Sequence, residues 1–529
     1  MTNGVISGWS ISKHLFEVWG SIDIIGDYNR DTVRPVDVVC ALPPHLHEDD
    51  RKNRIVLARN KIYIRERSNN MLRDTGKPAN PSTSSPTNVV ILGGGFAGIE
   101  VLRKLQNEFD TDSSVEITLI SKDNFILFTP MLPEVASGMI ETRNIVTPVR
   151  SFCKKAKFYQ AKVESIDLNS EKLILTHAIG RQSQPNDWRE HILKYDYLVI
   201  ALGSENNFFK MSDVQKYSFT MKSIDDAIIL RSHIINVLEQ ASLEEDNIEL
   251  RKSLLTFVVA GGGFNGVETV GAINDFIRES IKDYYKNIHL SEVRIILTDT
   301  NEKLLAEVDE ELGEFALEKL KVNGVEFMMK CPVTGATANS IKLYNGTIIP
   351  CYTIIWSAGV TPSKLVAELP CEHDRGHRIV ANNYLEVPGY SGVYVLGDCA
   401  SITDPHTGKP YPPTAQHAIR QGKVAAKNII SAVKGENGDK DKVKFDYKTK
   451  GMMAEIGKRT GVAILFDKFK LHGFLAWWLW RTYYLANLPT ARKKLKVLGD
   501  WISDLIFRPD VSMITREEKE SGEEQEKIH

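Results

Sequence analysis

The chain has 529 residues, of which 42% are hydrophobic and 25% are charged, and its formal net charge is -2 at pH 7. This length allows about three domains, and the hydrophobic fraction is sufficient for packed cores. The near-zero charge argues against a nucleic-acid partner, and the six cysteines form no pair or cluster at metal-ligand spacing, so we expect no metal site.

The first 86 residues carry no clear domain signature. The stretch 51–66 has the composition of a pair of strands, and a Pro- and Ser-rich linker follows it. Two interpretations stay open: residues 1–86 form a small accessory extension, or the natural chain begins at Met71. No basic region followed by an apolar core opens the chain, so we expect no secretory signal peptide.

A glycine-rich loop follows the first strand after this linker. NVVILGGGFAGIE places Gly93, Gly95 and Gly98 between a β-branched run and a helix with an apolar stripe. In such a loop the first glycine permits a tight turn, the second lets the backbone approach a pyrophosphate, and the third lets the helix pack on the sheet. The next strand ends at Ser121 and Lys122, where a serine can bond a ribose but the usual acidic residue is missing.

The same device occurs a second time. TFVVAGGGFNGVE places Gly261, Gly263 and Gly266 in a matching strand, turn and helix. The following strand, VRIILTD, ends at Asp299, which favours NAD over NADP because a 2′-phosphate would meet a carboxylate. Asp299 lies further from the loop than usual, so a lengthened helix or loop is expected between them. Two copies of the loop predict two bound dinucleotides.

Two amphipathic helices are predicted near the C-terminus, before a disordered acidic tail. The first holds GFLAWWLW and is interrupted by Arg481, so it is too short to cross a bilayer, which takes about 20 apolar residues. The second predicted helix has an apolar face made of Leu495, Leu498, Trp501, Ile502 and Leu505, and a polar face with Arg492, Lys496 and Asp500.

Four of the eight tryptophans lie in this C-terminal region: Trp477, Trp478, Trp480 and Trp501. Aromatic and basic residues on an amphipathic pair are typical of a helix that lies in the plane of a membrane surface. The alternatives are a dimer interface or an internal core helix, because amphipathic helices usually face a core.

From about Asn88 to Ile514 the chain resembles the type II NADH:quinone oxidoreductases, the single-subunit flavoproteins of respiratory membranes. The segments that carry this resemblance are VVILGGGFAGIE, FILFTPMLPEVASG, YDYLVIALGS, VVAGGGFNGVE, IIWSAGV, VYVLGDCA, PPTAQHAIRQGKVAAKNI and KGMMAEIGKRTGVAIL. The resemblance implies an α/β fold with two Rossmann-like dinucleotide-binding domains. It also implies FAD as cofactor, NADH as electron donor and transfer of two electrons to a membrane quinone without proton pumping.

The order of these motifs implies that the NADH-binding domain is inserted into the FAD-binding domain. The first glycine loop and VYVLGD belong to the flavin domain, and the second loop lies between them. The implied divisions are an extension over 1–86, FAD-binding residues 87–218, an inserted NADH-binding domain over 219–370, FAD-binding residues 371–445, a membrane-anchoring region over 446–514 and an acidic tail over 515–529.

The resemblance also implies individual cofactor contacts. Ala201 and Gly203, at the end of YDYLVIALGS, would contact FAD, and Asp398 would bind a hydroxyl of its ribityl chain. The alternatives are a core strand that ends in a turn and a plain helix cap. Ala358 and Gly359 in IIWSAGV would line the nicotinamide side.

The second half-reaction is assigned to three residues by the same resemblance. Glu268 would relay protons to reduced quinone, the alternative being a first-turn glutamate stabilised by its helix dipole. Gln416 would contact both flavin and quinone, although a second family glutamine is replaced here by Arg420, with Gln421 beside it. Lys450 would lie near the quinone, the alternative being a solvated lysine.

The implied partners are a membrane quinone, a lipid surface and a second copy of the chain. The implied location is peripheral, on the cytoplasmic or matrix-equivalent face of a respiratory membrane. Two alternative functions stay open. A sulfide:quinone oxidoreductase would need redox cysteines, for which Cys153 and Cys351 are the candidates. A non-catalytic NADH and flavin sensor would need no quinone turnover.

Overall fold

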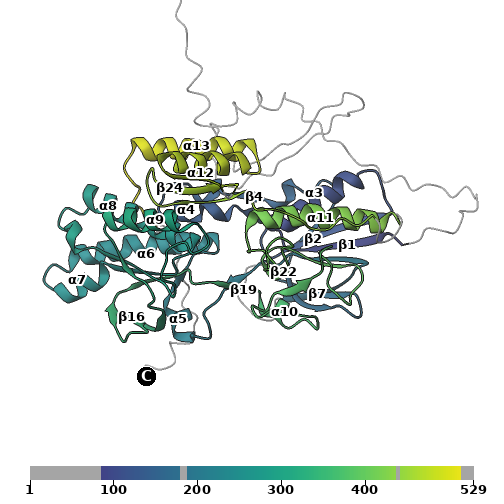
Figure 1. Ribbon diagram of the computed structural model, residues 1–529, viewed down its shortest axis with the longest axis horizontal. Coiled ribbons are helices and arrows are strands. Elements are labelled where there is room, and N and C mark those ends of the chain that lie inside the picture. The colour runs from purple at the N-terminus through teal and green to yellow at the C-terminus, as the bar shows by residue number, and fades with distance from the viewer. Residues whose placement is uncertain (1–84, 179–187, 436–440, 467, 514–529) are drawn as a thin grey trace, which may run out of the picture. The chain divides into compact units, whose positions relative to one another are not determined.

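The structure is a computed structural model that describes residues 85–178, 188–435, 441–466 and 468–513. The strand pair predicted at 51–66 and the acidic tail lie outside these residues. The predicted α/β pattern is present in the described residues as two parallel sheets with helices packed on them (Figure 1).

The first sheet is built around the first glycine loop. Its strands, in spatial order, are β21 (Val393–Val395), β9 (Tyr197–Ile200), β1 (Thr87–Leu92), β2 (Val115–Ser121) and β5 (Lys157–Gln160). All neighbouring strands run parallel. Residues Val89 to Leu92 are completely buried or nearly so, as expected for a parallel strand covered on both faces. Helices α3 (Phe96–Glu108) and α11 (Ala415–Val433) pack against each other beside this sheet (Figure 1).

The second sheet is built around the second glycine loop. Its strands, in spatial order, are β11 (Phe219–Thr220), β18 (Thr353–Trp356), β12 (Thr256–Ala260), β13 (Arg294–Thr298) and β14 (Val325–Met328), all parallel to their neighbours. Alternate residues of β12 face opposite sides, because strand side chains have a period of two. Phe257 and Val259 pack in the core that the sheet forms with the helices. Val258 and Ala260 pack in a smaller core on the opposite face of the sheet.

Four longer helices accompany the second sheet: α6 (Ile224–Leu243), α7 (Ile248–Leu254), α8 (Phe264–Asp283) and α9 (Glu310–Val322). Helix α8 has 20 residues and is followed by a turn and the short 3-10 helix η6 (Leu290–Glu292). This confirms the lengthened connection expected between the second loop and Asp299. Helix α4 (Leu132–Ala136), which comes from FILFTPMLPEVASG, packs against α6 and α8.

The chain leaves the first sheet after β9 and returns to it at β21, where Val393 lies opposite Leu198. On the way out and back, β10 (Glu205–Asn206) pairs antiparallel with β19 (Val360–Thr361). The remaining small sheets are β3 (Phe125–Leu127) with β4 (Val146–Pro148), β6 (Lys162–Asp167) with β7 (Lys172–Ala178) and β8 (Trp188–Lys194), β15 (Val333–Thr337) with β16 (Ser340–Leu343) and β17 (Ile348–Pro350), and β20 (Ile379–Ala381) with β22 (Ala400–Ile402).

The C-terminal region is a three-stranded antiparallel sheet followed by two helices (Figure 1). These elements are β23 (Gly451–Glu455), β24 (Gly461–Leu465), β25 (Phe469–Gly473), α12 (Phe474–Asn487) and α13 (Ala491–Ile506). Within the described ranges, every helix is too short or too polar to cross a bilayer.

The two C-terminal helices were predicted correctly, but the direction of their tryptophans was not. Trp477, Trp480 and Trp501 are buried, and only Trp478 of the four is largely exposed. The expected apolar face of α13 therefore loses Trp501, which turns into the core, while its other members remain exposed. Asp500 accepts hydrogen bonds from the side chain of Asn144 at 2.6 Å, so it is tied to the body of the protein.

Candidate active site

A cavity of about 3420 Å³ reaches from the first glycine loop to the second. Single ligands usually occupy about 300–1,000 Å³, so this space is large enough for more than one. The predicted site residues on its wall are Gly93, Gly95, Ser121, Lys122, Ala201, Gly203, Gly263, Glu268, Gly359, Asp398, Gln416 and Lys450. The other predicted residues, Gly98, Gly261, Gly266, Asp299 and Ala358, lie behind the wall.

The first glycine loop has the geometry of a phosphate cradle. Gly93 has a φ of +106°, and a Cβ there would lie 2.1 Å from the carbonyl oxygen of Ala201. A Cβ on Gly98 would lie 2.0 Å from the oxygen of Gly93, whereas Gly95 opens onto free space. Gly95 begins α3 without a side-chain cap, so free N–H groups face the cavity. The residues present fit the pyrophosphate of a dinucleotide.

The second glycine loop repeats this geometry. Gly261 has a φ of +118°, and its Cβ would lie 2.5 Å from the oxygen of Ser357. A Cβ on Gly266 would meet the oxygen of Gly261 at 1.8 Å, while nothing lies within 4 Å of Gly263. Ala358 packs behind Gly261 and does not reach the cavity. A second dinucleotide fits here for the same physical reason as the first.

The acidic residue of the second unit supports its loop from behind. Asp299 accepts a hydrogen bond from the backbone N–H of Gly262 at 2.5 Å and another from Asn301 at 2.6 Å. Glu307, which the sequence did not single out, lines the cavity nearby. Burial, and then the charge of Asp299, raises the pKa of Glu307. Glu307 is therefore the acidic side chain that reaches this end of the cavity, with Asp299 behind it.

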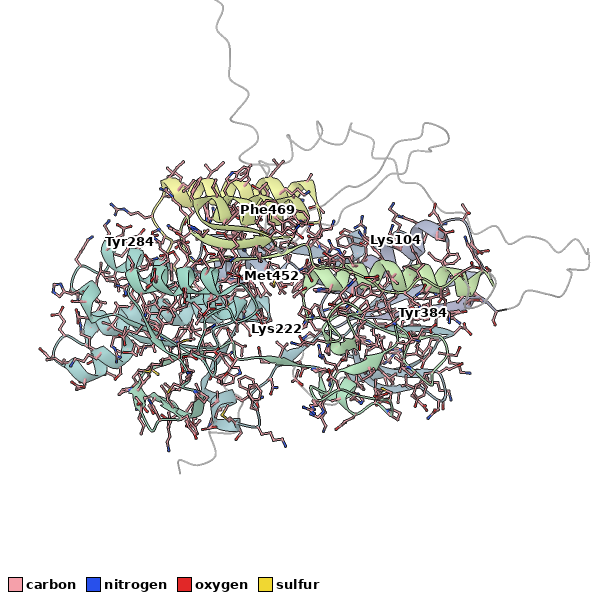
Figure 2. The ribbon with its side chains drawn as sticks, viewed as in Figure 1. Lys104, Lys222, Tyr284, Tyr384, Met452 and Phe469 are labelled. Carbon is pink, nitrogen blue, oxygen red and sulfur yellow. The ribbon has the colours of Figure 1, made fainter. Side chains whose placement is uncertain are left out.

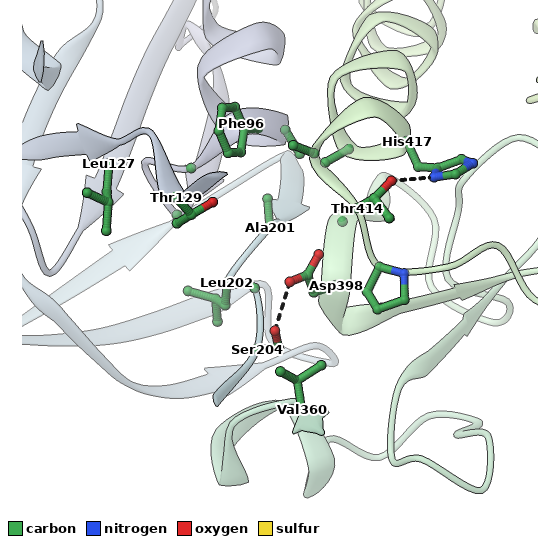
Figure 3. A pocket seen from close by; sticks show the side chains of 18 of the residues that line it. Phe96, Leu127, Thr129, Ala201, Leu202, Ser204, Val360, Asp398, Thr414 and His417 are labelled. Carbon is green, nitrogen blue, oxygen red and sulfur yellow. Dashed lines mark hydrogen bonds between the residues drawn. The ribbon is translucent and has the colours of Figure 1, made fainter. Parts of the chain in front are cut away.

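Asp398 lies in the short 3-10 helix η7 (Gly397–Cys399) after β21 and lines the cavity (Figure 3). The hydroxyl of Ser204 donates to Asp398 Oδ2 at 2.8 Å, and Lys222 Nζ donates to Ser204 Oγ at 2.8 Å. Lys222 (Figure 2) also lies 3.6 Å from the same carboxylate oxygen. Sequence reasoning missed both partners, because they are remote in sequence from Asp398. Gln421 is buried and accepts from the N–H of Gly397 at 2.8 Å, so it supports this turn.

The first turn of α11 brings Gln416 to the cavity. Its side-chain amide donates to the oxygen of Gly451 at 3.3 Å and accepts from the hydroxyl of Tyr447 at 3.3 Å. Arg420 lies 4.2 Å above the Tyr447 ring and donates to the Gln416 carbonyl at 2.8 Å. Lys450 is exposed on the same wall. The arginine that replaces a family glutamine is thus stacked on a tyrosine beside Gln416.

His417 is a further cavity residue that the sequence did not single out. The hydroxyl of Thr414 lies 2.7 Å from His417 Nδ1 (Figure 3), and that of Thr449 lies 3.3 Å from Nε2. Burial, and then the charge of Arg420, lowers the pKa of His417 to about 4. The imidazole is therefore neutral at physiological pH and serves as a hydrogen-bonding group.

Glu268 lies just past the first turn of α8, which holds no acidic residue, and it lines the cavity. Its Oε1 accepts from the indole of Trp480 at 2.9 Å and from the backbone N–H of Glu455 at 3.2 Å. Burial raises the pKa of Glu268 to about 8, so the side chain carries a proton at neutral pH. A first-turn glutamate stabilised as an anion by the helix dipole would instead have a lowered pKa.

The two candidate redox cysteines do not meet at this cavity. Cys351 is completely buried in the smaller core of the second sheet. Cys153 packs against the core of the first sheet. Burial raises the pKa of Cys351 to about 12, which suppresses its thiolate. Among the described residues neither cysteine lines the cavity, so the geometry offers no support for disulfide chemistry there.

Comparisons with known proteins agree with this geometry. Residues 87–422 match the family described as pyridine nucleotide-disulphide oxidoreductase, and residues 449–510 match the NDH2 C-terminal domain. A probable NADH dehydrogenase of Dictyostelium discoideum is 34% identical over 427 residues, which are 80% of this chain and 90% of that protein.

A bacterial relative and a solved structure show the same likeness. The type II NADH:quinone oxidoreductase Ndh of Mycobacterium tuberculosis is 32% identical over 78% of this chain and 87% of its own length. The structure of NDH2 from Plasmodium falciparum in complex with NADH has a TM-score of 0.72 at 21% identity, covering 80% of this chain and 99% of that one.

Proposed function

This chain belongs to the type II NADH:quinone oxidoreductases, and we infer that its FAD-dependent transfer of electrons from NADH to quinone takes place in the cavity between the two glycine loops. The enzyme oxidises NADH and delivers two electrons to a quinone without pumping protons. The observation that supports this location best is the continuity of one cavity from the first loop to the second.

The chain's own residues supply binding and orientation. The first loop and α3 would hold the pyrophosphate of FAD, with Ser121 and Lys122 near its ribose. Asp398, fixed by Ser204 and Lys222, would accept a hydrogen bond from the ribityl chain. When bound, the flavin takes two electrons from NADH and passes them to the acceptor.

The second loop would hold NADH so that its nicotinamide points along the cavity toward the flavin site. Gly263 leaves room for the pyrophosphate, and Gly359 lines the wall between the loops. Glu307 would receive the adenosine ribose, and Asp299, which supports the loop from behind, would add a second charge that disfavours NADPH. The strand pairing supports the proposed inserted domain at 219–370, because β10, which precedes that range, pairs with β19, which lies near its end, so the outgoing and returning chains run side by side.

Glu268, Gln416 and Lys450 would serve the quinone end of the reaction. All three line the same cavity, and Glu268 carries the proton that a reduced quinone requires. Gln416 is held by Gly451 and Tyr447, so its amide has a fixed orientation. Arg420 would replace the missing family glutamine as a hydrogen-bond donor near the quinone oxygen.

The outer surface of the C-terminal region would rest on a lipid bilayer. Its exposed apolar side chains are Phe466 and Phe469 on the hairpin, Phe474, Leu475 and Trp478 on α12, and Leu495, Leu498, Ile502, Leu505 and Ile506 on α13. Arg492 and Lys496 are exposed beside them and would attract anionic headgroups. Leu479 and Tyr483 of α12 line the cavity, so one helix joins the proposed lipid-facing surface to the proposed quinone site.

The peripheral location would be the face of a respiratory membrane on which NADH is available. A homodimer is also proposed, and a dimer that docks on lipid is compatible with the same surface. Sedimentation of purified protein, with and without anionic vesicles, shows whether lipid or a second copy of the chain covers the apolar surface.

Steady-state turnover with NADH and a short-chain ubiquinone analogue tests the proposed function. The enzyme is expected to reduce the quinone with NADH in the presence of bound FAD. Slow formation of an NADH complex without turnover would favour the sensor. Quinone reduction that depends on sulfide and disappears in Cys351→Ser would favour a sulfide:quinone oxidoreductase.

A further inference from the structure

Three glutamates, the buried Glu134 and Glu455 and the half-buried Glu268, each accept a hydrogen bond from the indole of a C-terminal tryptophan. The three pairs are Trp480 to Glu268 at 2.9 Å, Trp477 to Glu455 at 2.7 Å and Trp501 to Glu134 at 2.9 Å. The glutamates come from α8, β23 and α4, so three distant segments place their carboxyl groups under α12 and α13. The tryptophans, which the sequence indicated for a membrane surface, instead enclose these acids.

Arg481 is inserted among the same groups. Its Nη2 lies 3.2 Å from Glu134 Oε1 and 3.8 Å from Glu455 Oε1. The guanidinium is stacked between two indoles, 4.4 Å from the ring centre of Trp477 and 4.6 Å from that of Trp501. The residue that interrupts the apolar run of α12 is therefore the cation of a buried charge cluster.

The charges of this cluster do not balance if every group is ionised. Two carboxyl groups, those of Glu134 and Glu455, share the one guanidinium, and unpaired charges are costly away from water. Glu134 Oε2 is buried without a hydrogen-bond partner among the described residues, where a full negative charge would be costly. Burial raises the pKa of Glu134 to about 7 and also raises that of Glu455, with the charge of Glu134 as a second cause. Burial and the excess of carboxyl groups over cations therefore both favour retained protons in this cluster.

A second set of charged groups lies near this cluster and closer to the surface. Lys458 lies in the turn after β23, and its backbone N–H donates to Asp275 at 2.6 Å. Its ammonium lies 2.6 Å from Glu279 and 3.6 Å from Asp504, whose side chains are 37% and 18% exposed. The titratable and charged groups that face the cluster are Glu134 of α4, Glu268, Asp275 and Glu279 of α8, Glu455 and Lys458 of β23 and its turn, Arg481 and Tyr484 of α12 and Asp504 of α13.

We propose that Glu455 and Glu134, held by Arg481, store the protons that restore Glu268 after it has protonated the reduced quinone. This rests on the proposed function. The overall balance is NADH, one proton and quinone to NAD⁺ and quinol, with two electrons passing from NADH. The O–H bond of Glu268 breaks as the quinol O–H bond forms, and Glu268 regains a proton from Glu455. The store is refilled from solvent beside Lys458 and Asp275.

Glu455 and Glu134 are positioning residues in this scheme, because they act through Glu268. The decisive comparison uses two acceptors for NADH oxidation: a short-chain ubiquinone analogue, which takes up protons, and ferricyanide, which does not. In Glu455→Gln the quinone-dependent kcat is expected to fall about tenfold, whereas the ferricyanide rate stays within about twofold of wild type. Glu134→Gln, the second variant, is expected to show the same split.

Glu326→Gln is the matched control, since Glu326 is an exposed glutamate paired with Arg294 on the second sheet. It is expected to change neither rate. Bound flavin and melting temperature are measured for every variant, so that Glu134→Gln still decides the test if Glu455→Gln does not fold. Equal losses with both acceptors, or no loss with quinone, would overturn the proposal. Wild-type protein that fails to reduce quinone would instead overturn the proposed function.

Tryptophan fluorescence provides a measurement that is independent of turnover. Three indoles bond directly to the three acids, so their emission should change as the acids lose protons. The charge of Glu455 contributes to the raised pKa of Glu268. The fluorescence midpoint is therefore expected to move to lower pH in Glu455→Gln, and an unchanged midpoint in both glutamine variants would contradict a shared proton store.

Discussion

The two glycine loops have nearly the same backbone and different surroundings. In each, the first glycine is in the left-handed region, and the helix glycine touches its carbonyl oxygen. Both loops end in a glutamate at the same position, Glu100 in the first and Glu268 in the second. Glu100 lies 3.4 Å from Arg103, whereas Glu268 is enclosed by Trp480 and the backbone of Glu455.

This difference shows that a repeated motif determines where a phosphate binds but leaves the chemistry of the site to its neighbours. Glu100 is itself buried, and the Arg103 guanidinium beside it supplies a compensating positive charge. The same residue under a tryptophan retains its proton and becomes a candidate acid. The neighbours that produce this change come from the C-terminal region, which packs against α8.

The largest expected effect is the loss of a different ligand from each glycine loop when its first glycine is replaced. Gly93→Ala forces a Cβ to 2.1 Å from the Ala201 oxygen and should destabilise the fold by about 3 kcal/mol and abolish flavin binding. Gly261→Ala creates a similar clash with Ser357 in the second loop and should abolish NADH binding while FAD stays bound. Gly95→Ala, where nothing lies within 4 Å, is the control for folding.

Flavin absorbance and NADH titration of the three variants check this prediction. Loss of flavin in Gly261→Ala together with its retention in Gly93→Ala would reverse the assignment of the loops.

The second prediction compares the two equivalent glutamates. Glu268→Gln removes the proton donor and should lower quinone-dependent kcat about 100-fold, while Glu100→Gln should cause a much smaller loss. Steady-state rates with quinone and with ferricyanide measure both. Similar losses in the two variants would mean that the enclosed environment of Glu268 has no role in turnover.

The same pair predicts how stability depends on pH. Because burial raises the folded-state pKa of Glu268 to about 8, above the ordinary value of 4.5, its contribution to the free energy of unfolding is complete below 4.5 and is lost as pH rises through 8. The melting temperature of wild type should therefore fall across this window more steeply than that of Glu268→Gln. Parallel curves for the two proteins would show that Glu268 is ionised in the folded state.

The third prediction concerns the ends of the strands after each loop. Asp299→Asn keeps an acceptor for Gly262 but removes the charge, so the ratio of kcat/KM for NADPH over NADH should rise about tenfold. Ser121→Ala in the first unit should leave this ratio unchanged. A ratio that does not respond to Asp299→Asn would assign cofactor choice to other groups, with Glu307 the next to test.

The smallest expected effect concerns the outer face of the C-terminal helices, opposite the buried acids. Replacing Leu498 and Ile502 together by Asp should lower binding to anionic vesicles about fivefold and leave ferricyanide reduction intact. Leu243→Asp changes a side chain that is 84% exposed at the end of α6 and is the control. Unchanged vesicle binding with a loss of dimer would assign this face to a second copy of the chain.

Local patterns were sufficient to predict the two loops. Strand, glycines and helix are contiguous, and their geometry depends on contacts within a few residues of Gly93 or Gly261, so the sequence contains what determines them. Helices α12 and α13 could be predicted for the same reason. Their tryptophans could not be oriented, because the acids that bond Trp480 and Trp501 lie 212 and 367 positions away in the chain.

The supporting groups of the candidate site were also beyond local patterns. Lys222 reaches Ser204 and Asp398 from the turn between β11 and α6, and no motif marks it. Arg481 reads as a polar interruption of an apolar run until Glu134 and Glu455 are placed beside it. Charged residues inside an otherwise apolar helix are the signal that could have indicated this buried cluster.

The central claim is that NADH and FAD meet in the cavity joining the two loops. Anaerobic titration of the purified holoprotein with NADH, followed by flavin absorbance, tests it most directly. The flavin should bleach with one equivalent of NADH and regain its colour when a quinone analogue is added. A purified protein without flavin, or a flavin that keeps its oxidised spectrum with excess NADH, would contradict the claim.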